Sequence, residues 1–404
     1  MDAFQAVESV ARASYGRLVA YLSARSQDVA GAEDALSEAF RCALETWPKD
    51  GVPEKPEAWL LVVARRRVLD HLRHQKVRTD AVLKLRLVAE EAEKPSMFPD
   101  ERLKLLFICA HPAINEGART PLMLQTVLGL DAARIASAFL VAPTAMSQRL
   151  VRAKAKIRDA GIPFALPEPH ELPTRLNFVM EAIYAAYSTG WDDVAGVDPR
   201  RRGLAEEAIW LARVVVQLMP GEAEARGLLA LMLHCEARRQ ARRGQHGEYI
   251  PLSRQEVTLW SSTMIEEAER ALTEASACRS LGRFQLEAAI QSVHAQRALT
   301  GQTNWEVIAL LYEELVCLTP TLGALVGRAA ALAEARGPMV GLAALEAVAA
   351  ESVLAYQPYW AVRAHLLNKL GRQKEAQGAY TRAIGLSEDE QVRNFLIEQA
   401  RSEG

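Results

Sequence analysis

The sequence has few cysteines, few aromatic residues and no long apolar run. Five cysteines occur among 404 residues, and no two of them are spaced as C-x-x-C, which argues against a disulfide framework and against a zinc site. The longest stretch without a charged residue, Ile135–Gln148, covers 14 residues, whereas a bilayer span needs about 20. The first residues lack the basic start and apolar run of a secretory signal. We therefore expect a cytoplasmic protein that does not enter a membrane and carries neither metal nor cofactor.

Catalytic motifs are missing as well. The chain has no phosphate-binding loop, no G-x-S-x-G, no H-E-x-x-H and no Rossmann glycine fingerprint. Histidine and cysteine come close together in three places, but each pair lacks a third and a fourth metal ligand nearby. The pairs are Cys109 with His111, His234 with Cys235, and His71 with His74. The sequence therefore does not favour an enzyme.

Basic charge gathers in the first half of the chain. Residues 1–170 hold 24 Lys and Arg against 21 Asp and Glu, whereas residues 171–404 hold 24 against 29. Six basic residues and one aspartate lie between Arg65 and Arg78, and five basic residues and no acid lie between Arg149 and Arg158. Such clusters are typical of proteins that bind a polyanion, although a solvated helix face gives the same pattern.

The composition predicts an all-α protein, because Ala, Leu, Glu and Arg dominate and alternating β-branched runs are missing. Prolines and acidic residues interrupt the helical pattern at 47–56, 90–95 and 161–173. These breaks separate two small helical domains from a large helical array. The expected division is a first domain at 1–77, a linker at 78–97, a second domain at 98–160, a proline-rich linker at 161–173 and the array at 174–404.

Residues 131–159 have the pattern of a helix-turn-helix. Apolar side chains stand where the two helices would cross: Ile135, Phe139 and Val141. Ala136 is small where the helices would approach closely, and Leu140 replaces the glycine that the turn usually has. Pro143 suits the first turn of the second helix, where the backbone N–H is unpaired anyway. A structural helical hairpin would show the same pattern, but the basic residues that follow favour DNA binding.

The second helix, expected over 144–159, separates into an inner and an outer face. The inner face consists of Met146, Leu150, Ala153 and Ile157, which recur at helical spacing. The outer face consists of Ser147, Gln148, Val151 and Arg152. Arg and Gln make bidentate contacts to guanine and adenine edges, and an apolar tip meets a thymine methyl group. Contacts to phosphates are expected from Arg149, Lys154, Lys156 and Arg158.

Two segments of the first domain resemble the extracytoplasmic-function (ECF) sigma factors of bacterial RNA polymerase. That family carries AED-x-x-Q-E-x-F, and residues 32–40 read AEDALSEAF. It also carries W-L-x-x-x-A-R-N-x-x-x-D-x-x-R, and residues 59–73 read WLLVVARRRVLDHLR. Ser37 and Arg66 depart from these patterns. The family's recognition helix, T-V-x-x-R-L-x-R-A-R, is similar to AMSQRLVRAK at 145–154.

The resemblance implies a role for each segment. The helix with Asp34, Glu38 and Phe40 would dock on the clamp of the largest subunit of core RNA polymerase. The minus-10 element of the promoter would be opened by the loop at 47–57 and the helix at 58–73, through Trp47, Arg65, Arg66, Arg67 and Arg73. The helix at 144–159 would bind the minus-35 element. The three consecutive arginines cover too wide an arc of their helix to share one face, so we expect at least one of them to pair within the protein. Trp59 is expected in the core.

The C-terminal block carries degenerate helical repeats. The best unit matches a tetratricopeptide (TPR) helix pair: Ala364, Leu367, Gly371, Ala376, Tyr380 and Ala383. Such arrays offer a concave surface to a protein or peptide. The start of the block, residues 176–190, resembles the extension of one ECF subgroup, many of whose members are encoded beside small YCII-like (DGPF) proteins. A regulatory protein of that kind is therefore a candidate partner.

Three hypotheses remain at this point. The first is an ECF-type sigma factor that directs promoter-specific initiation and whose TPR-like domain modulates activity or partner binding. The second is a helix-turn-helix regulator with a helical sensor domain. The third is a TPR scaffold with incidental basic segments. The first domain discriminates among them, because a regulator or scaffold has no need for Asp34 and Glu38 followed by the Trp-Leu…Ala-Arg helix.

Overall fold

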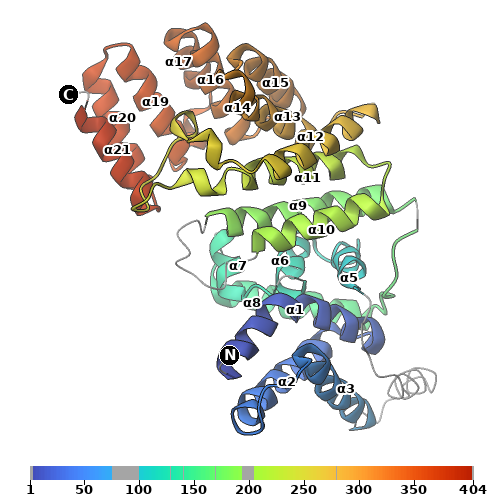
Figure 1. Ribbon diagram of the computed structural model, residues 1–404. Coiled ribbons are helices and arrows are strands. Elements are labelled where there is room, and N and C mark those ends of the chain that lie inside the picture. Colours follow the sequence, from blue (N-terminus) through green and yellow to red (C-terminus); the bar gives the residue numbers. More distant parts are fainter. Residues whose placement is uncertain are drawn as a thin grey trace. The chain divides into compact units, whose positions relative to one another are not determined.

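The computed structural model describes residues 3–74, 100–127, 129–139, 141–168, 170–192, 204–278 and 280–402. Within these ranges the chain forms helices joined by loops, with one isolated β-bridge between Arg243 and Tyr249 (Figure 1). The predicted all-α class is confirmed. The chain divides into two compact units. Unit 1 runs to Gly190 and takes in the first part of one further helix up to Val214, and unit 2 contains the chain from Val215 onward.

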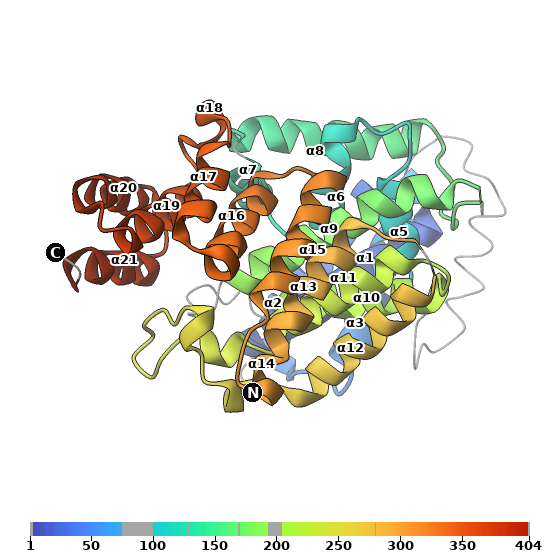
Figure 2. The same cartoon turned by 90° about the horizontal axis from the view of Figure 1, so that it is seen from above.

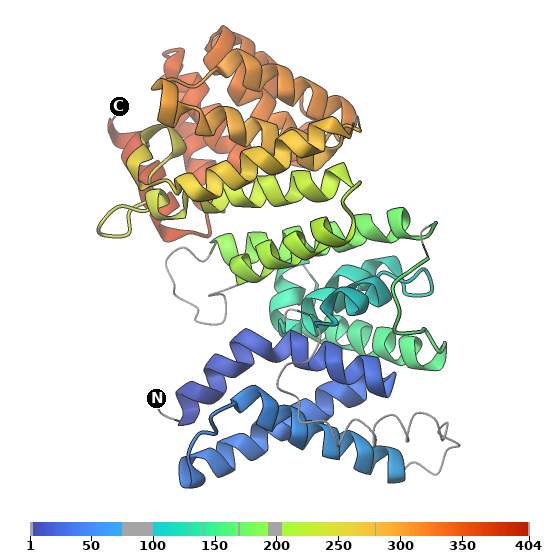
Figure 3. The same cartoon turned by 45° about the vertical axis from the view of Figure 1, so that its right-hand side comes forward.

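Unit 1 begins with three helices that pack on one another: α1 (Ala3–Ser26), α2 (Val29–Asp50) and α3 (Pro56–His74). Helix α2 buries one stripe at helical spacing, consisting of Val29, Ala32, Leu36, Ala39 and Ala43. Burying a side chain such as Leu36 stabilises the fold by about 2 kcal/mol. Figure 3 shows α1, in dark blue, lying along α2 and α3.

Helix α2 ends later than the sequence predicts. The break expected at Trp47 begins only at Gly51, and Pro48 lies inside the last helical turn. A proline removes one backbone hydrogen bond from a helix, but the buried Trp47 ring holds this turn against the core. Gly51 ends the helix with φ of +89° and donates its N–H to the Trp47 carbonyl over 3.0 Å, a backbone conformation that favours glycine.

The second part of unit 1 consists of four helices: α5 (Arg102–Cys109), α6 (Glu116–Thr126), α7 (Ala132–Ala138) and α8 (Pro143–Asp159). Helix α8 ends at Asp159 and α9 (Leu172–Asp192) begins after the proline-rich segment, as the prolines predict. Helix α9 up to Gly190, and the following α10 (Leu204–Leu218) up to Val214, belong to unit 1. The guanidinium of Arg119 lies 4.6 Å from the Phe178 ring, and that of Arg102 lies 4.0 Å from the Trp210 ring.

Unit 2 continues as successive helices that pack mainly against their sequence neighbours. The helices are α11 (Ala223–Glu236), α12 (Ser262–Ala277), α13 (Arg283–Ala295), α14 (Arg297–Thr300), α15 (Trp305–Leu318), α16 (Leu322–Arg336), α17 (Pro338–Glu346), α18 (Ala350–Val353), α19 (Gln357–Lys369), α20 (Gln373–Leu386) and α21 (Glu390–Ser402). Three short 3₁₀ turns, Arg239–Arg242, Leu252–Arg254 and Val257–Leu259, lie between α11 and α12.

The helix pair α19–α20 lies where the repeat pattern predicts it. Gly371 forms the turn with φ of +71°, and the apolar positions of the pattern are buried: Ala364, Leu367, Ala376, Tyr380 and Ala383. In Figure 2 these two helices and α21 lie side by side at the C-terminal end of unit 2. The small residues at the crossing let the two helices approach closely.

Candidate nucleic-acid interface

Helix α8 has the inner face that the sequence predicts. Met146, Leu150, Ala153 and Ile157 are all buried, and Pro143 occupies the first turn, where it costs no hydrogen bond. On α7, Ile135 and Ala136 are buried as expected. Phe139 is 37% exposed and stands in the turn directly after α7, which ends at Ala138. Leu140 lies outside the described residues.

The outer face of α8 is open to solvent. Ser147, Gln148, Val151 and Arg152 are exposed. One guanidinium nitrogen of Arg152 donates to Gln148 Oε1 over 3.3 Å, one helical turn away. This bond places the two side chains that are best suited to base edges side by side. Val151 stands beside them with 63% of its surface exposed.

A groove of about 480 Å³ runs beside this face. It lies between α8 and the segment 113–118, and its lining includes Gln148, Arg149, Arg152 and Lys156. Arg149 donates to the Gly117 carbonyl over 3.1 Å, so its guanidinium is held at the N-terminus of α6. The Asn115 side chain caps that helix by accepting the N–H of Gly117 over 3.1 Å. The sequence pattern does not reveal this wall of the groove, although Asn115 before Glu116 is a recognisable helix-start signal.

Lys154 faces helix α2. Its Nζ lies 2.6 Å from Glu33 Oε2 on α2, and both side chains are largely buried. Burial raises the pKa of the Glu33 carboxyl, and the charge of Lys154 opposes that shift. Lys156 is exposed on the outer side of the helix. Arg158 pairs with the neighbouring Asp159 at 3.1 Å. The basic residues of α8 therefore point in several directions, and Lys154 already has an anionic partner.

The acidic residues of α2 occupy a partly solvated face. Asp34 is exposed, whereas Glu38 and Phe40 are half-buried. Glu38 accepts hydrogen bonds from Arg41 at 2.8 Å and from Arg67 of α3 at 3.0 Å. The hydrogen bond from Arg41 holds the pKa of the Glu38 carboxyl below its ordinary value. The sequence did not reveal Arg41 as a partner, even though its spacing of three from Glu38 permits the contact.

Two residues predicted to contact the minus-10 element are buried. The Trp47 ring is 2% exposed and makes an edge contact with Trp59 at 5.5 Å between ring centroids. Arg65 is also buried and donates to the Tyr21 hydroxyl over 2.9 Å. In this structure neither side chain presents itself to a base, so we leave both out of the candidate surface. Trp59 is half-buried, which makes Trp47 the more deeply placed of the two rings.

Arg65, Arg66 and Arg67 point in different directions, as consecutive residues of a helix must. Arg65 points into the core, and Arg67 pairs with Glu38, so the expectation that at least one pairs within the protein is confirmed. Arg66 and Arg67 are exposed and remain the basic side chains of α3 that a nucleic acid can reach. The side chain of Arg73 lies outside the described residues.

Comparison with known proteins relates the first helices of the chain to a family. A model of sigma-70 region 2 matches residues 10–78. Two mycobacterial proteins are 40% identical to the chain over 62 residues, which cover 15% of this chain and 31% of each of theirs. They are the probable RNA polymerase sigma-C factor of Mycobacterium bovis and the ECF RNA polymerase sigma factor SigC of Mycobacterium tuberculosis. Over residues 10–78 the chain is therefore an ECF-like sigma factor.

Other comparisons cover the rest of this sigma factor. A model of a family of unknown function, DUF6596, matches residues 175–276, the part of the chain that begins with α9. An uncharacterized protein of Rhizobium meliloti (strain 1021) is 37% identical over 381 residues, covering 92% of this chain and 89% of that protein. No solved structure matches the chain.

The sigma-70 region 2 match takes in α1 from Val10 onward, α2 and α3, with Asp34, Glu38, Arg66 and Arg67. The helices α7 and α8 that carry the candidate minus-35 surface follow it in the chain. Among the described helices of this sigma factor, none combines the length and the apolarity needed to cross a membrane.

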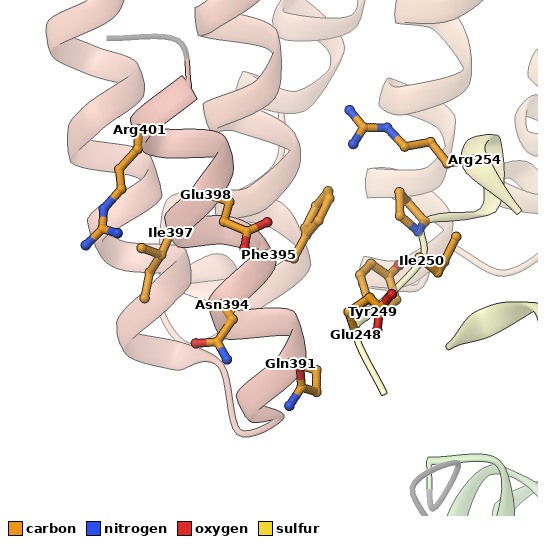
Figure 4. Close-up of a pocket in the computed structure, with 11 residues that line it drawn as sticks. Glu248, Tyr249, Ile250, Arg254, Gln391, Asn394, Phe395, Ile397, Glu398 and Arg401 are labelled. Atoms are coloured by element: carbon orange, nitrogen blue, oxygen red, sulfur yellow. The ribbon is translucent and has the colours of Figure 1, made fainter. Parts of the chain in front are cut away.

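Unit 2 of the sigma factor has a hollow of its own. A cavity of about 390 Å³ lies between residues 248–254 and helix α21 (Figure 4). Tyr249 and Phe395, which both line it, meet edge to face with ring centroids 5.4 Å apart. Arg254 and Arg401 contribute cations, and Glu398 contributes a carboxylate. The mixture of apolar and charged groups suits a protein or peptide segment no better than a small polar molecule, so we assign no ligand to it.

Proposed function

We propose that this sigma factor binds core RNA polymerase and directs transcription initiation at specific promoters. The exposed acidic face of α2, with Asp34 and Glu38, is the proposed contact to the polymerase clamp, and Phe40, on another side of the same helix, is proposed to contribute to it. Arg66 and Arg67 of α3 are the proposed contacts to the minus-10 element. The outer face of α8, with Gln148, Val151 and Arg152, is the proposed reader of the minus-35 element. The cytoplasm is the compartment in which these partners meet.

The observation that carries this proposal is the pairing of two surfaces on one chain. The region 2 match covers α1 to α3, and an exposed Gln148–Arg152 pair stands on a helix whose inner face is fully buried. A helix-turn-helix regulator would need only the second surface. A scaffold protein would need neither. Arg and Gln at one helical turn, with their polar ends in solvent, have the geometry for bidentate contacts in a major groove.

We extend the proposal to the C-terminal region. The α19–α20 pair has the small-residue crossing and the buried Tyr380 of a tetratricopeptide unit, which supports a TPR-like domain that binds a regulatory protein. A small YCII-like (DGPF) protein is the proposed candidate. In this proposal the domain modulates when the sigma factor acts, and it performs no catalysis.

Transcription from a randomised promoter library tests the proposal. The full chain is combined with purified core RNA polymerase, and the transcripts are sequenced to recover the promoters that were used. We expect a shared minus-35 and minus-10 sequence among them. A chain that binds DNA but supports no initiation with core polymerase would instead be the regulator described above, and the proposal would fail.

The selected promoter then tests the residues of α8. We expect Gln148→Ala and Arg152→Ala each to weaken binding to the minus-35 duplex by about 1–3 kcal/mol, because each removes a bidentate contact to a base. Binding is measured by fluorescence anisotropy with the selected duplex and with a scrambled one. Arg372→Ala is the matched control, since it removes an exposed arginine of unit 2 that pairs with Glu375. Equal losses on both duplexes would show that the two side chains contact phosphates only.

A further inference from the structure

Hydrogen-bond donors dominate the outer face of α8. Gln148 and Arg152 lie one helical turn apart, and a guanidinium nitrogen of Arg152 donates to Gln148 Oε1 over 3.3 Å. A guanidinium has N–H donors and no acceptor. The bond can therefore form only with the amide oxygen, and it fixes which end of the Gln148 amide faces Arg152. The amide nitrogen, with its two N–H donors, is left at the opposite end for other partners.

Oxygen acceptors beside this face already receive hydrogen bonds from within the protein. The Gly117 carbonyl accepts from Arg149 over 3.1 Å, and Asn115 Oδ1 accepts the N–H of Gly117 over 3.1 Å. The groove between α8 and the segment 113–118 also has the exposed Lys156 in its lining. Among the described residues, no carboxylate lines this groove. The polar groups that it offers to a ligand are therefore mainly donors.

The bases differ in what they present to such a surface in the major groove of DNA. Guanine presents two acceptors, N7 and O6, whereas adenine presents one acceptor and one donor, and cytosine presents a donor. A glutamine that reads adenine needs its amide oxygen for the adenine amino group. Arg152 already donates to that oxygen of Gln148. The two hydrogens on the amide nitrogen of Gln148 match the two acceptors of guanine instead, and Arg152 keeps its remaining N–H donors for a guanine of its own.

We propose that Gln148 and Arg152 each read a guanine in the minus-35 element, and that Arg152 sets this specificity by orienting the Gln148 amide. The inference rests on the proposed function, because it requires that α8 binds promoter DNA. Arg152 is thus both a base contact and a positioning residue. A hydrogen bond of this kind shifts the ratio of the two amide orientations by about two- to tenfold. The preference for guanine over adenine at the position that Gln148 reads gains by that factor.

Initiation from a set of altered promoters tests the inference. The full chain is combined with core RNA polymerase, and each base pair of the selected minus-35 element is changed in turn to the three others. The ratio of the initiation rates with guanine and with adenine is measured at each position, on both strands. We expect guanine to be preferred about tenfold at two positions. Gln148→Ala should abolish the preference at one of them, which identifies the position that Gln148 reads.

Two further variants separate the orientation of the amide from contact alone, and both change exposed residues. Gln148→Lys replaces the amide by a group that has donors only, so the preference for guanine should remain at the same position. Arg152→Met removes the donor to Gln148 Oε1. It should abolish the preference at the position that Arg152 reads and reduce it about two- to tenfold at the other. Lys156→Ala is the control, because it removes a cation from the same groove and should slow initiation from every promoter by a similar factor.

Each outcome decides the inference. A preference for adenine at the position that Gln148→Ala affects would show that the amide oxygen reads the base, and the inference would be wrong. It would also be wrong if Gln148→Lys lost the preference for guanine, or if Arg152→Met left the ratio at the Gln148 position unchanged. If the wild type initiates but neither residue affects any base preference, the inference fails while initiation with core polymerase stands. If the wild type initiates from no promoter, the proposed function fails together with the inference.

Discussion

Single buried side chains of unit 2 carry consequences for stability. His234 of α11 is 1% exposed, and burial lowers the pKa of its imidazole to about 3, with Arg238 adding to the shift. The carboxylate of Glu269 lies 3.4 Å from its Nε2 atom but is partly solvated. The folded protein therefore keeps this histidine neutral over most of the acidic range.

The free energy of unfolding of unit 2 should fall in mild acid. In the unfolded chain His234 takes up a proton below its ordinary pKa of 6.5, whereas in the folded chain it does not until about pH 3. The stability that it contributes is present above pH 6.5 and is lost as the pH falls toward 3. At pH 5 the loss should reach about 2 kcal/mol.

Urea denaturation of wild type and His234→Leu at pH 7 and pH 5 measures this loss. The loss in the free energy of unfolding between pH 7 and pH 5 should be smaller in His234→Leu by about 2 kcal/mol. The control His246→Gln changes an exposed histidine and should lose as much as the wild type. An equal acid loss in His234→Leu would mean that other groups are responsible.

At the level of single residues, the sequence predicts some positions and not others. The inner face of α8 is predictable because a helix repeats every 3.6 residues, so burial of Met146 or Ile157 follows from spacing alone. The partner of Arg65 is not predictable, because Tyr21 stands 44 positions away and on another helix. The burial of Trp47 depends in the same way on how three helices meet, and spacing within α2 cannot reveal it.

At the scale of single elements, the turn between α19 and α20 makes a matched test. Gly371 has a φ of +71°, and a Cβ there would meet no atom within 4 Å. Gly378 lies exposed inside α20, again with open space for a Cβ. Gly371→Ala should destabilise unit 2 by about 1–2 kcal/mol because the left-handed backbone disfavours a Cβ. Gly378→Ala should stabilise it by about 0.5–1 kcal/mol because alanine favours a helix.

Thermal denaturation of the two variants and the wild type gives the comparison. Opposite shifts of the midpoint are expected. A stabilising effect at both positions would mean that the turn relaxes to a backbone that tolerates alanine.

Element boundaries depend on chemistry that pattern alone describes poorly. The start of α8 at Pro143 was predictable, since proline suits a first turn. The end of α2 was not, because Pro48 normally indicates a break and here lies within the last turn. The burial of the Trp47 ring holds this last turn of α2 in place. The same limit applies to Phe139, which an apolar pattern assigns to the helix crossing and the short α7 leaves in a turn.

At the scale of the whole molecule, the helices after the proline-rich segment matter for unit 1. Arg102 of α5 is 4% exposed on its side chain and pairs with Asp100 at 2.9 Å. It also forms an ion pair with Glu207 of α10 and stacks over Trp210. Sequence patterns placed the domain limit at residue 160, because prolines usually separate domains. They could not show that a side chain of α5 takes partners from α10.

A chain that ends after Pro173 should therefore be less stable than one that ends after Leu218, the last residue of α10. The shorter chain loses Glu207 and Trp210 around Arg102, and Phe178 beside Arg119. We expect the free energy of unfolding to drop by about 2 kcal/mol or more. Circular dichroism during urea denaturation measures both chains. Equal free energies of unfolding would show that α9 and α10 do not stabilise the helices before them.

The Glu33–Lys154 ion pair has a consequence for the order in which partners assemble. Glu33 lies beside Asp34 in the sequence but is buried against Lys154, so a polymerase that bound Asp34 and moved α2 enough to displace Glu33 would release Lys154 for DNA. Thermodynamic coupling is reciprocal: the factor by which polymerase raised the affinity for DNA would equal the factor by which DNA raised the affinity for polymerase. The Glu33–Lys154 ion pair of 2.6 Å would then make each partner an effector of the other. The full affinity for either partner would be reached only with the other one bound.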